Sequence, residues 1–345
     1  MKEEIKKIDI STKAILKVVL IGLFLWLVFL TREVLMLLFV AIILVSALEP
    51  AIDKLETKKI PRVAGAAMVY LAFIAFLVLG IYVIAPILLQ EIKHLAENVP
   101  QYLDGLNKFM GNLNTLAVDY NFERNLQSLL NNASERLTDL VSMAFSNTFT
   151  FFSGLLKLVI VLSLSFYLVV KREGIRGFIN FIVPEKHRRY SIQLTQKIQN
   201  KMGRWLIGQL SLALVVFLLD FAILSFLGVP YALLLALIGG FLEIIPYIGP
   251  VLAFIPAVLV SLTVSPIIAL LVAFFYILVQ QTENHVLTPL IMKKAVGLDP
   301  VVIILALLIG GTLAGLLGIL IAVPLATAAS VIIEDFHKFM NKKEA

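Results

Sequence analysis

The chain has 345 residues, of which 60% are hydrophobic and 15% charged, and its mean hydropathy is +0.97. These values exclude a soluble globular domain and, with repeated long apolar runs, predict an all-α polytopic membrane protein. The formal net charge of +6 comes from Lys and Arg beside the apolar runs, which indicates membrane topology rather than nucleic-acid binding, and the absence of cysteine excludes disulfides and thiolate metal sites.

The N-terminal membrane part, residues 1–89, begins with a basic tail. Three apolar runs follow, each read as a membrane helix: 14–30, 34–48 and 63–89. Because the second run follows the first at once, we expect an uncleaved signal anchor rather than a removable signal peptide.

The composition changes at residues 90–147, where seven acids outnumber four bases. Apolar residues recur there at spacings of three and four, which is typical of amphipathic helices. We expect a small extracytoplasmic domain of two or three helices, acting as a packed cap or an assembly surface.

A fourth membrane helix is predicted at 148–170, where Lys157 is expected to snorkel or to form an ion pair. Residues 171–204 carry nine Lys or Arg against two Glu. We interpret them as a basic cytoplasmic amphipathic segment, in which a helix from about 185 to 204 lies along the membrane surface.

Residues 205–333 form the predicted C-terminal membrane core, followed by a cytoplasmic tail at 334–345. Four apolar segments are expected in the core: 205–227, 231–264, 267–282 and 301–333. A loop is expected at 283–299. From Trp205 to Met292, the only Asp, Glu, Lys or Arg residues are three acids: Asp220, Glu243 and Glu283.

These segments give about eight crossings, two of them broken by Gly and Pro. The basic stretches then place both termini in the cytoplasm and the 90–147 domain outside. If the sixth or eighth segment is instead a re-entrant hairpin, the parity changes and the topology must be redrawn.

The sixth segment contains the string G-G-F-L-E-I-I-P-Y-I-G-P at 239–250. Proline removes a backbone donor, and a broken helix at membrane depth survives where it is buried in protein or lines a wet cavity. An acid at this depth indicates a functional site. The alternative is a Pro-kinked span with a buried Glu that is hydrogen-bonded to a neighbour.

The eighth segment repeats this pattern, since a Leu-Ile-Gly-Gly sequence occurs at both 237–240 and 308–311. Paired Gly/Pro-interrupted segments point to the binding site of a secondary transporter. Glycine pairs also occur where helices pack closely, and this alternative stays open.

We expect a substrate or ion site centred on Glu243. Its other candidate residues are Pro246, Tyr247, Gly249, Pro250, Asp220, Gln280, Gln281, Glu283, Gly310 and Gly311. Acids without a neighbouring base favour a cation or proton over an anion. No catalytic residue, metal ligand or cofactor is expected, because neither a phosphate-binding loop nor an H-E-x-x-H motif is present, and we do not interpret the chain as an enzyme.

The string E-I-I-P-Y-I-G-P at 243–250 resembles the signature of the AI-2E family, the autoinducer-2 exporter-like permeases. The resemblance continues into Gln280, Glu283, Pro289 and the G-G…G…G…P pattern that ends at Pro324. It implies an inner-membrane secondary transporter that exports small polar signalling molecules of the autoinducer-2 type, coupled to an ion gradient.

Some relatives are instead associated with Na⁺(Li⁺)/H⁺ antiport, which the three acids suit equally well. A non-transporting membrane scaffold is the hypothesis from another class. The expected partners are the lipid bilayer, a small polar solute, H⁺ or Na⁺, and further copies of the chain in a homo-oligomer, with no nucleic acid.

Overall fold

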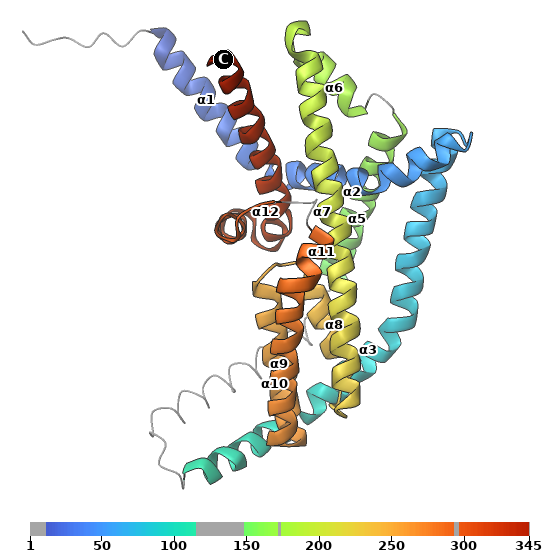
Figure 1. Ribbon diagram of the computed structural model, residues 1–345, viewed down its shortest axis with the longest axis vertical. Coiled ribbons are helices and arrows are strands. Elements are labelled where there is room, and N and C mark those ends of the chain that lie inside the picture. Colours follow the sequence, from blue (N-terminus) through green and yellow to red (C-terminus); the bar gives the residue numbers. More distant parts are fainter. Residues whose placement is uncertain (1–11, 115–147, 172–173, 293–296, 345) are drawn as a thin grey trace, which may run out of the picture.

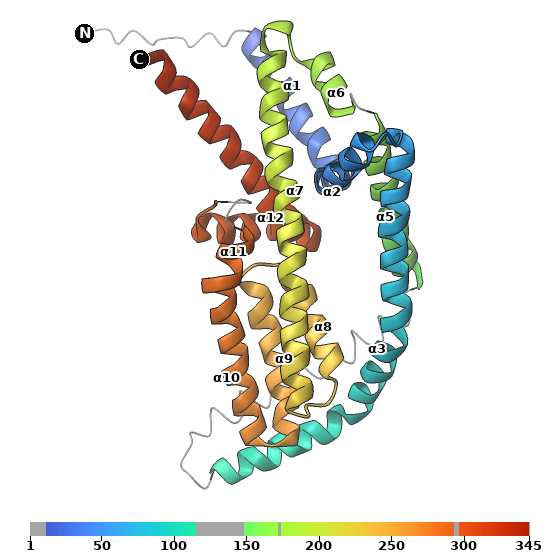
Figure 2. The same cartoon turned by 45° about the vertical axis from the view of Figure 1, so that its right-hand side comes forward.

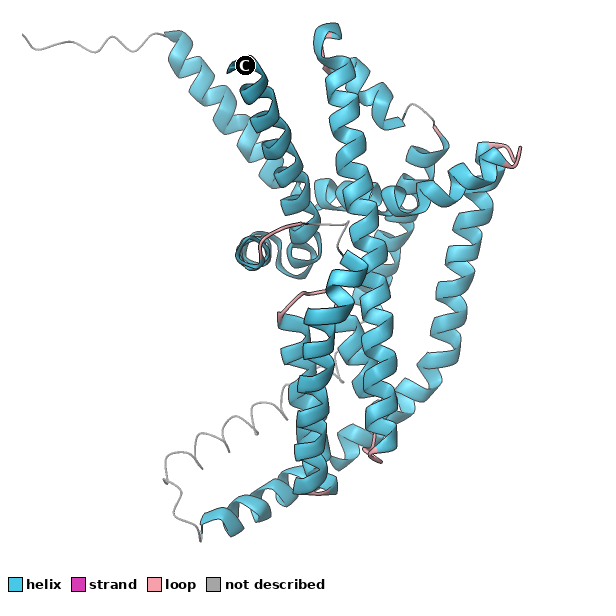
Figure 3. Ribbon diagram, in the orientation of Figure 1, coloured by secondary structure: helices cyan, strands magenta, loops and turns pink. Residues whose placement is uncertain are grey.

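The computed structural model describes residues 12–114, 148–171, 174–292 and 297–344. Within these ranges the chain forms helices joined by short turns, with no strand (Figure 3). Six helices are long and apolar enough to cross a membrane: α2 (Arg32–Thr57), α3 (Arg62–Asn114), α5 (Thr148–Val170), α7 (Glu185–Phe226), α10 (Pro266–Thr282) with its extension to Met292, and α12 (Pro300–Glu344). The all-α polytopic membrane fold is therefore confirmed.

The N-terminal half contains α1 (Thr12–Leu30), α2, α3 and α5. Helix α5 has the bounds expected for the fourth membrane helix, and Lys157 within it pairs with Glu33 of α2 at 3.5 Å. Helix α3 runs on past residue 89 to Asn114, so residues 90–114 continue the third membrane helix. The remainder of the expected outer domain, 115–147, lies outside the described residues.

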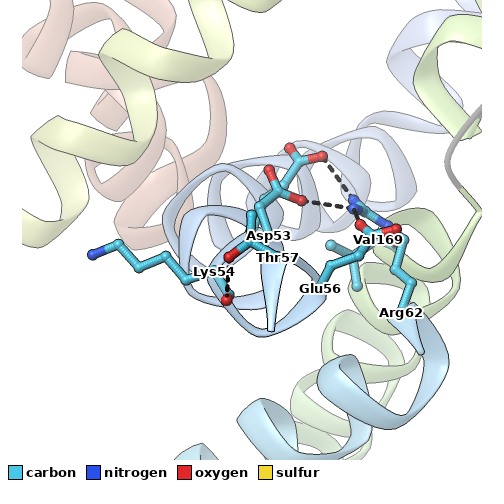
Figure 4. Close-up of polar contacts among 7 residues, drawn as sticks. Asp53, Lys54, Glu56, Thr57, Arg62 and Val169 are labelled. Carbon is cyan, nitrogen blue, oxygen red and sulfur yellow. Dashed lines mark hydrogen bonds and ion pairs between the residues drawn. The ribbon is translucent and has the colours of Figure 1, made fainter. Parts of the chain in front are cut away.

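Arg62 joins three helices at one corner of the molecule (Figure 4). Its guanidinium pairs with three carboxylates of α2: Glu49 at 3.0 Å, Asp53 at 2.6 Å and Glu56 at 3.1 Å. Its Nε donates a hydrogen bond of 2.8 Å to the carbonyl of Val169 at the end of α5. One cation at the start of α3 therefore fixes the ends of α2 and α5.

Helix α7 is one continuous helix of 42 residues that includes the basic half at 185–204. Figures 1 and 2 show this half continuing along the axis of the apolar half. The expectation of a separate helix along the membrane surface is therefore wrong, because no break separates residues 185–204 from the span. A short helix, α6 (Gly174–Ile182), packs against α7 instead.

The sixth segment folds into a hairpin of α8 (Ala232–Leu242) and α9 (Ile248–Val264). A Cβ on Gly239 would stand 3.7 Å from the Cβ of Ala253. In a straight helix these two residues would lie about 21 Å apart. The chain therefore turns back at residues 243–247 rather than running straight on.

Local signals position this hairpin. After α7, Gly228 has a φ of +65°, Val229 donates to the carbonyl of Leu224, and Gly228 donates to that of Ser225, which is a Schellman motif. Before α10, the side chain of Ser265 accepts from the backbone of Ile268 as an N-cap. These two turns join both arms of the hairpin to long neighbouring helices.

Helix α12 also folds back on itself. Ala314 and Gly315 have non-helical backbone angles, and Gly315 has a φ of +57°. The backbones of Gly310 and Gly318 contact each other, so residues 300–313 form a first arm and 316–344 a second arm. Both broken segments are hairpins rather than straight spans. The eight-crossing topology expected from the sequence therefore has to be redrawn.

The expected loop at 283–299 is partly wrong. Helix α10 continues through a π-helical turn, η1 (Glu283–Leu287), into α11 (Thr288–Met292), which packs against α7. Figure 2 places α11 midway along the molecule. The start of α1, the start of α7 and the end of α12 lie at one end of the molecule, and the turns α7–α8 and α9–α10 lie at the other.

Candidate functional site

The tip of the α8–α9 hairpin, residues 243–247, forms the centre of the candidate site. Pro246 lacks a backbone N–H and cannot extend α8, and the backbone of Glu243 donates to the carbonyl of Gly239 in the last turn of α8. Gln209 of α7 donates a side-chain hydrogen bond to the backbone carbonyl of Glu243. The tip is therefore attached to the middle of α7.

Tyr247 adopts an unusual backbone conformation at this tip, with a φ of +66° and a ψ of −41°. Ile248 donates a hydrogen bond of 2.8 Å to the carbonyl of Pro246, which closes a three-residue γ-turn around Tyr247. Such conformations are strained for residues other than glycine and cluster at functional sites.

The acids Asp220, Glu243 and Glu283 come from α7, the hairpin tip and η1, and all three are buried. The side chains of Glu243 and Glu283 lie within hydrogen-bonding range, and Asp220 interacts electrostatically with both. Gln280 donates a hydrogen bond of 3.2 Å to Oε2 of Glu283. Two carboxyl groups can share a hydrogen bond only when one of them carries a proton.

Several polar atoms in this cluster lack a hydrogen-bond partner. In the described part of the chain, four buried side-chain atoms have none, and three of them belong here: Oδ1 of Asp220, Oε2 of Glu243 and the hydroxyl of Tyr276. Tyr276 lies in α10 and interacts electrostatically with Asp220. Since buried polar groups in proteins are nearly always satisfied, this cluster is suited to hold a proton, a water or a small cation.

A cavity of about 290 Å³ opens beside Glu243 and Glu283. Its walls come from α7, the hairpin tip, η1, α11 and the two arms of α12. The lining residues are Trp205, Gln209, Leu212, Glu243, Pro246, Tyr247, Glu283, Asn284, Thr288, Pro289, Met292, Gly297, Leu298, Ile303 and Val323.

Among the described residues that line this cavity, the charged side chains are the acids Glu243 and Glu283, and none is Lys, Arg or His. No group of three or more His, Asp or Glu within the described residues is arranged to hold a metal ion. The cavity has polar groups that suit a small solute, and carboxyl groups that can take up a proton.

The residues proposed from the sequence separate into three groups. Glu243, Pro246, Tyr247 and Glu283 line the cavity. Asp220 lies behind them, Gln280 reaches Glu283, and Gly249 and Pro250 begin α9 without lining the cavity. Gln281, Gly310 and Gly311 also lie outside the lining, although α12 contributes Ile303 and Val323.

Sequence reasoning missed Gln209, Trp205, Thr288 and Tyr276. Gln209 carried a usable signal, because an amide inside the otherwise apolar span 205–227 needs a partner. Trp205 and Thr288 carried none, since their type and spacing are ordinary for membrane helices. Tyr276 looks like an aromatic core residue until the position of Asp220 is known.

Comparison with known proteins identifies the family. The model of the AI-2E family transporter matches residues 15–338, nearly the whole chain and all the elements that line the cavity. The chain belongs to the AI-2E transporter family. It is a membrane transporter, and this class of protein agrees with the absence of an enzyme motif in its sequence.

Relatives of this AI-2E transporter cover most of its length. The "Putative transport protein YrrI" of Bacillus subtilis (strain 168) is 26% identical over 319 residues, which are 92% of this chain and 90% of the relative. The "Putative transport protein YueF" of the same strain is 29% identical over 296 residues, 83% and 79% of the two chains. The "Putative permease PerM" of Escherichia coli (strain K12) is 27% identical over 302 residues, 86% and 85%.

Proposed function

We propose that this AI-2E transporter is a secondary transporter that exports small polar signalling molecules of the autoinducer-2 type, coupled to an ion gradient. The observation that carries the proposal is the cavity at the hairpin tip, where Glu243 and Glu283 face a small space with apolar walls and a few polar groups. A volume of about 290 Å³ suits a small solute, because pockets for drug-sized ligands reach about 300–1,000 Å³.

Solute recognition is assigned to the uncharged polar groups of this cavity. Gln209, Tyr247, Asn284 and Thr288 provide amide and hydroxyl groups that both donate and accept hydrogen bonds. These groups suit a hydroxyl-rich solute. The apolar walls, formed by Leu212, Met292 and Val323 among others, limit the size of what fits.

Ion coupling is assigned to the three acids. Several ionised carboxylates in a low-dielectric site without a counter-ion repel each other, so a bound proton or cation stabilises the cluster. Glu243 is the charge-bearing centre, Glu283 shares its proton, and Asp220 lies behind both. Binding and release of this ion are proposed to drive the movement of the α8–α9 tip.

Na⁺(Li⁺)/H⁺ antiport is the second candidate function. The unpartnered oxygens of Asp220 and Glu243 favour it, because a bound cation or proton is one way to satisfy a buried carboxylate oxygen. The scaffold hypothesis has less support, since the matched family and the named relatives are described as transporters, transport proteins or permeases.

We further propose that the protein lies in the inner membrane as a homo-oligomer, with both termini in the cytoplasm. The start of α1, the end of α12 and the basic start of α7 share one end of the molecule, which the positive-inside rule places in the cytoplasm. Exposed apolar side chains along α1, such as Phe24 and Trp26, offer a surface for lipid and for another copy.

Flux in proteoliposomes tests these functions. Purified protein is reconstituted, and uptake or release of an autoinducer-2-type solute is measured under an imposed pH or Na⁺ gradient. An exporter moves the solute, and an antiporter moves Na⁺ or Li⁺ against H⁺ without it. The absence of both fluxes would support the scaffold and overturn the proposed function.

A further inference from the structure

A second cavity, of about 560 Å³, lies between the α1–α2 turn and the α12 hairpin and shares no lining residue with the cavity beside Glu243 and Glu283. The turn between α1 and α2 forms one wall, with Phe29, Leu35 and Phe39. The α12 hairpin forms the other, with Leu313, Ile321 and Leu325. We call this cavity the Arg32 groove, because Arg32 is the one ionisable residue among the described residues that line it.

The shape of the groove follows from the glycines of the α12 hairpin. Gly310 and Gly318 bring the two arms together backbone to backbone, and both residues line the groove. Because neither glycine carries a side chain, nothing projects from these two positions into the groove, and the other groove-lining residues of the hairpin are apolar. The walls of this space suit a hydrocarbon chain.

Arg32 has no carboxylate partner among the described residues. Its Cζ lies 4.5 Å above the ring of Phe29, and its Nη1 lies 3.5 Å from the carbonyl of Leu313. The neighbouring acid, Glu33, pairs with Lys157 of α5 instead. Arg32 is exposed, so most of its five N–H donors remain available to an anion.

We propose that the Arg32 groove binds one anionic phospholipid, with its phosphate on Arg32 and an acyl chain along the apolar walls. Guanidinium groups bind phosphate through two parallel hydrogen bonds, and basic pockets between membrane helices recognise acidic headgroups. The lipid contacts the α1–α2 turn and both arms of α12, and it therefore stabilises the α12 hairpin. Ile303 and Val323 of this hairpin line the cavity beside Glu243 and Glu283.

The test measures thermal unfolding and lipid binding by native mass spectrometry on the full-length protein. Short-chain phosphatidylglycerol is titrated against phosphatidylcholine of equal chain length, and glycerol phosphate serves as the headgroup without a chain. We expect phosphatidylglycerol alone to raise the unfolding temperature. The variant Arg32→Gln should bind it roughly tenfold more weakly, which corresponds to about 1.4 kcal/mol.

The variant Arg188→Gln is the matched control, because Arg188 is half-exposed and paired with Glu185 in α7, outside the groove. Leu35→Trp fills the groove and should reduce binding while Arg32 is intact. Arg32→Lys retains the positive charge but not the paired guanidinium donors, and it replaces Arg32→Gln in the binding test if Arg32→Gln does not fold.

Three results would overturn the proposal. Phosphatidylcholine could raise the unfolding temperature as much as phosphatidylglycerol, the Arg188→Gln control could lose as much affinity for phosphatidylglycerol as Arg32→Gln, or glycerol phosphate alone could raise the unfolding temperature by the full amount. A second copy is the competing occupant of the groove. Single cysteines at Leu35 and Leu325 would then cross-link between copies regardless of added lipid, and that outcome would also contradict the lipid site.

Discussion

The carboxylate of Asp220 lies against the backbone of Gly239, so that a Cβ on Gly239 would stand 2.7 Å from Oδ2 of Asp220. This contact joins α7 to the first arm of the hairpin that carries Glu243. A glycine is needed there because any side chain would move the acid.

Gly239→Ala is therefore expected to displace Asp220 and slow transport, with a stability loss of about 1–3 kcal/mol from overpacking. Flux and thermal unfolding are measured on the same purified variant. Gly80→Ala is the control, since nothing lies within 4 Å of a Cβ at that position. Unchanged flux in Gly239→Ala would show that the position of Asp220 does not matter to transport.

Leucine at Gly249 or Gly310 tests the role of the two hairpins. A Cβ on Gly249 would overlap the carbonyl of Leu242, and one on Gly310 would overlap that of Gly318. We expect both variants to unfold at lower temperature and to lose transport. The variants Gly22→Leu and Gly80→Leu, whose positions have open surroundings, should keep the unfolding temperature and the transport rate of the wild type.

Comparing flux with stability separates the two explanations of these glycines. If flux loss merely follows the loss of stability at all four positions, the glycines serve helix packing. If flux falls further than stability predicts at Gly249 and Gly310, the hairpins belong to the moving parts of the transporter.

Arg62→Gln tests the corner of α2, α3 and α5 shown in Figure 4. The side chain of Arg62 is 13% exposed, and its loss leaves three carboxylates and the carbonyl of Val169 without their donor. We expect a loss of about 2 kcal/mol in the free energy of unfolding. Arg188→Gln, which removes an exposed ion pair, should cost much less.

Membrane sidedness is tested with inserted cysteines, since the natural chain has none. An impermeant thiol reagent applied to whole cells should label a cysteine at Asn112 and spare one at Gln193. These residues lie in α3 and in the basic half of α7, at opposite ends of the molecule. The reverse pattern would invert the proposed topology.

The fold was largely predictable from hydrophobic run length. The fourth membrane helix was predicted with its observed bounds, and Pro246 and Gly249 correctly indicated a broken sixth segment. The path of the broken segments was not predictable, because a Gly/Pro break fits both a kink and a hairpin. The close approach of Ala253 to Gly239, which a straight or merely kinked helix would hold far apart, distinguishes the two.

Periodicity misled the interpretation of residues 185–204. An amphipathic, basic helix suits both a surface helix and the cytoplasmic extension of a span, and the absence of Pro between Glu185 and Phe226 favoured the extension. The loop at 283–299 was expected from its polar residues, although Pro289 lies in the helical extension of α10, just after the π-helical turn η1.

The acids of the candidate site could be singled out from the sequence, because each interrupts an apolar segment. Their meeting could not be predicted, since Asp220 and Glu283 are 63 residues apart and come together only through the hairpin between them. Gln209 shows the same limit: its partner is a backbone carbonyl that the break at Pro246 exposes.

The most direct test of the account is ion-coupled flux through Glu243→Gln in proteoliposomes, measured across pH beside the wild type. The amide retains the size of the side chain and much of its hydrogen bonding, but it cannot exchange a proton or balance a cation. Glu33→Gln makes the same change at an exposed acid outside the cavity. We predict that Glu243→Gln remains folded and loses transport while Glu33→Gln retains it; normal flux with an unchanged pH profile in Glu243→Gln would contradict the account.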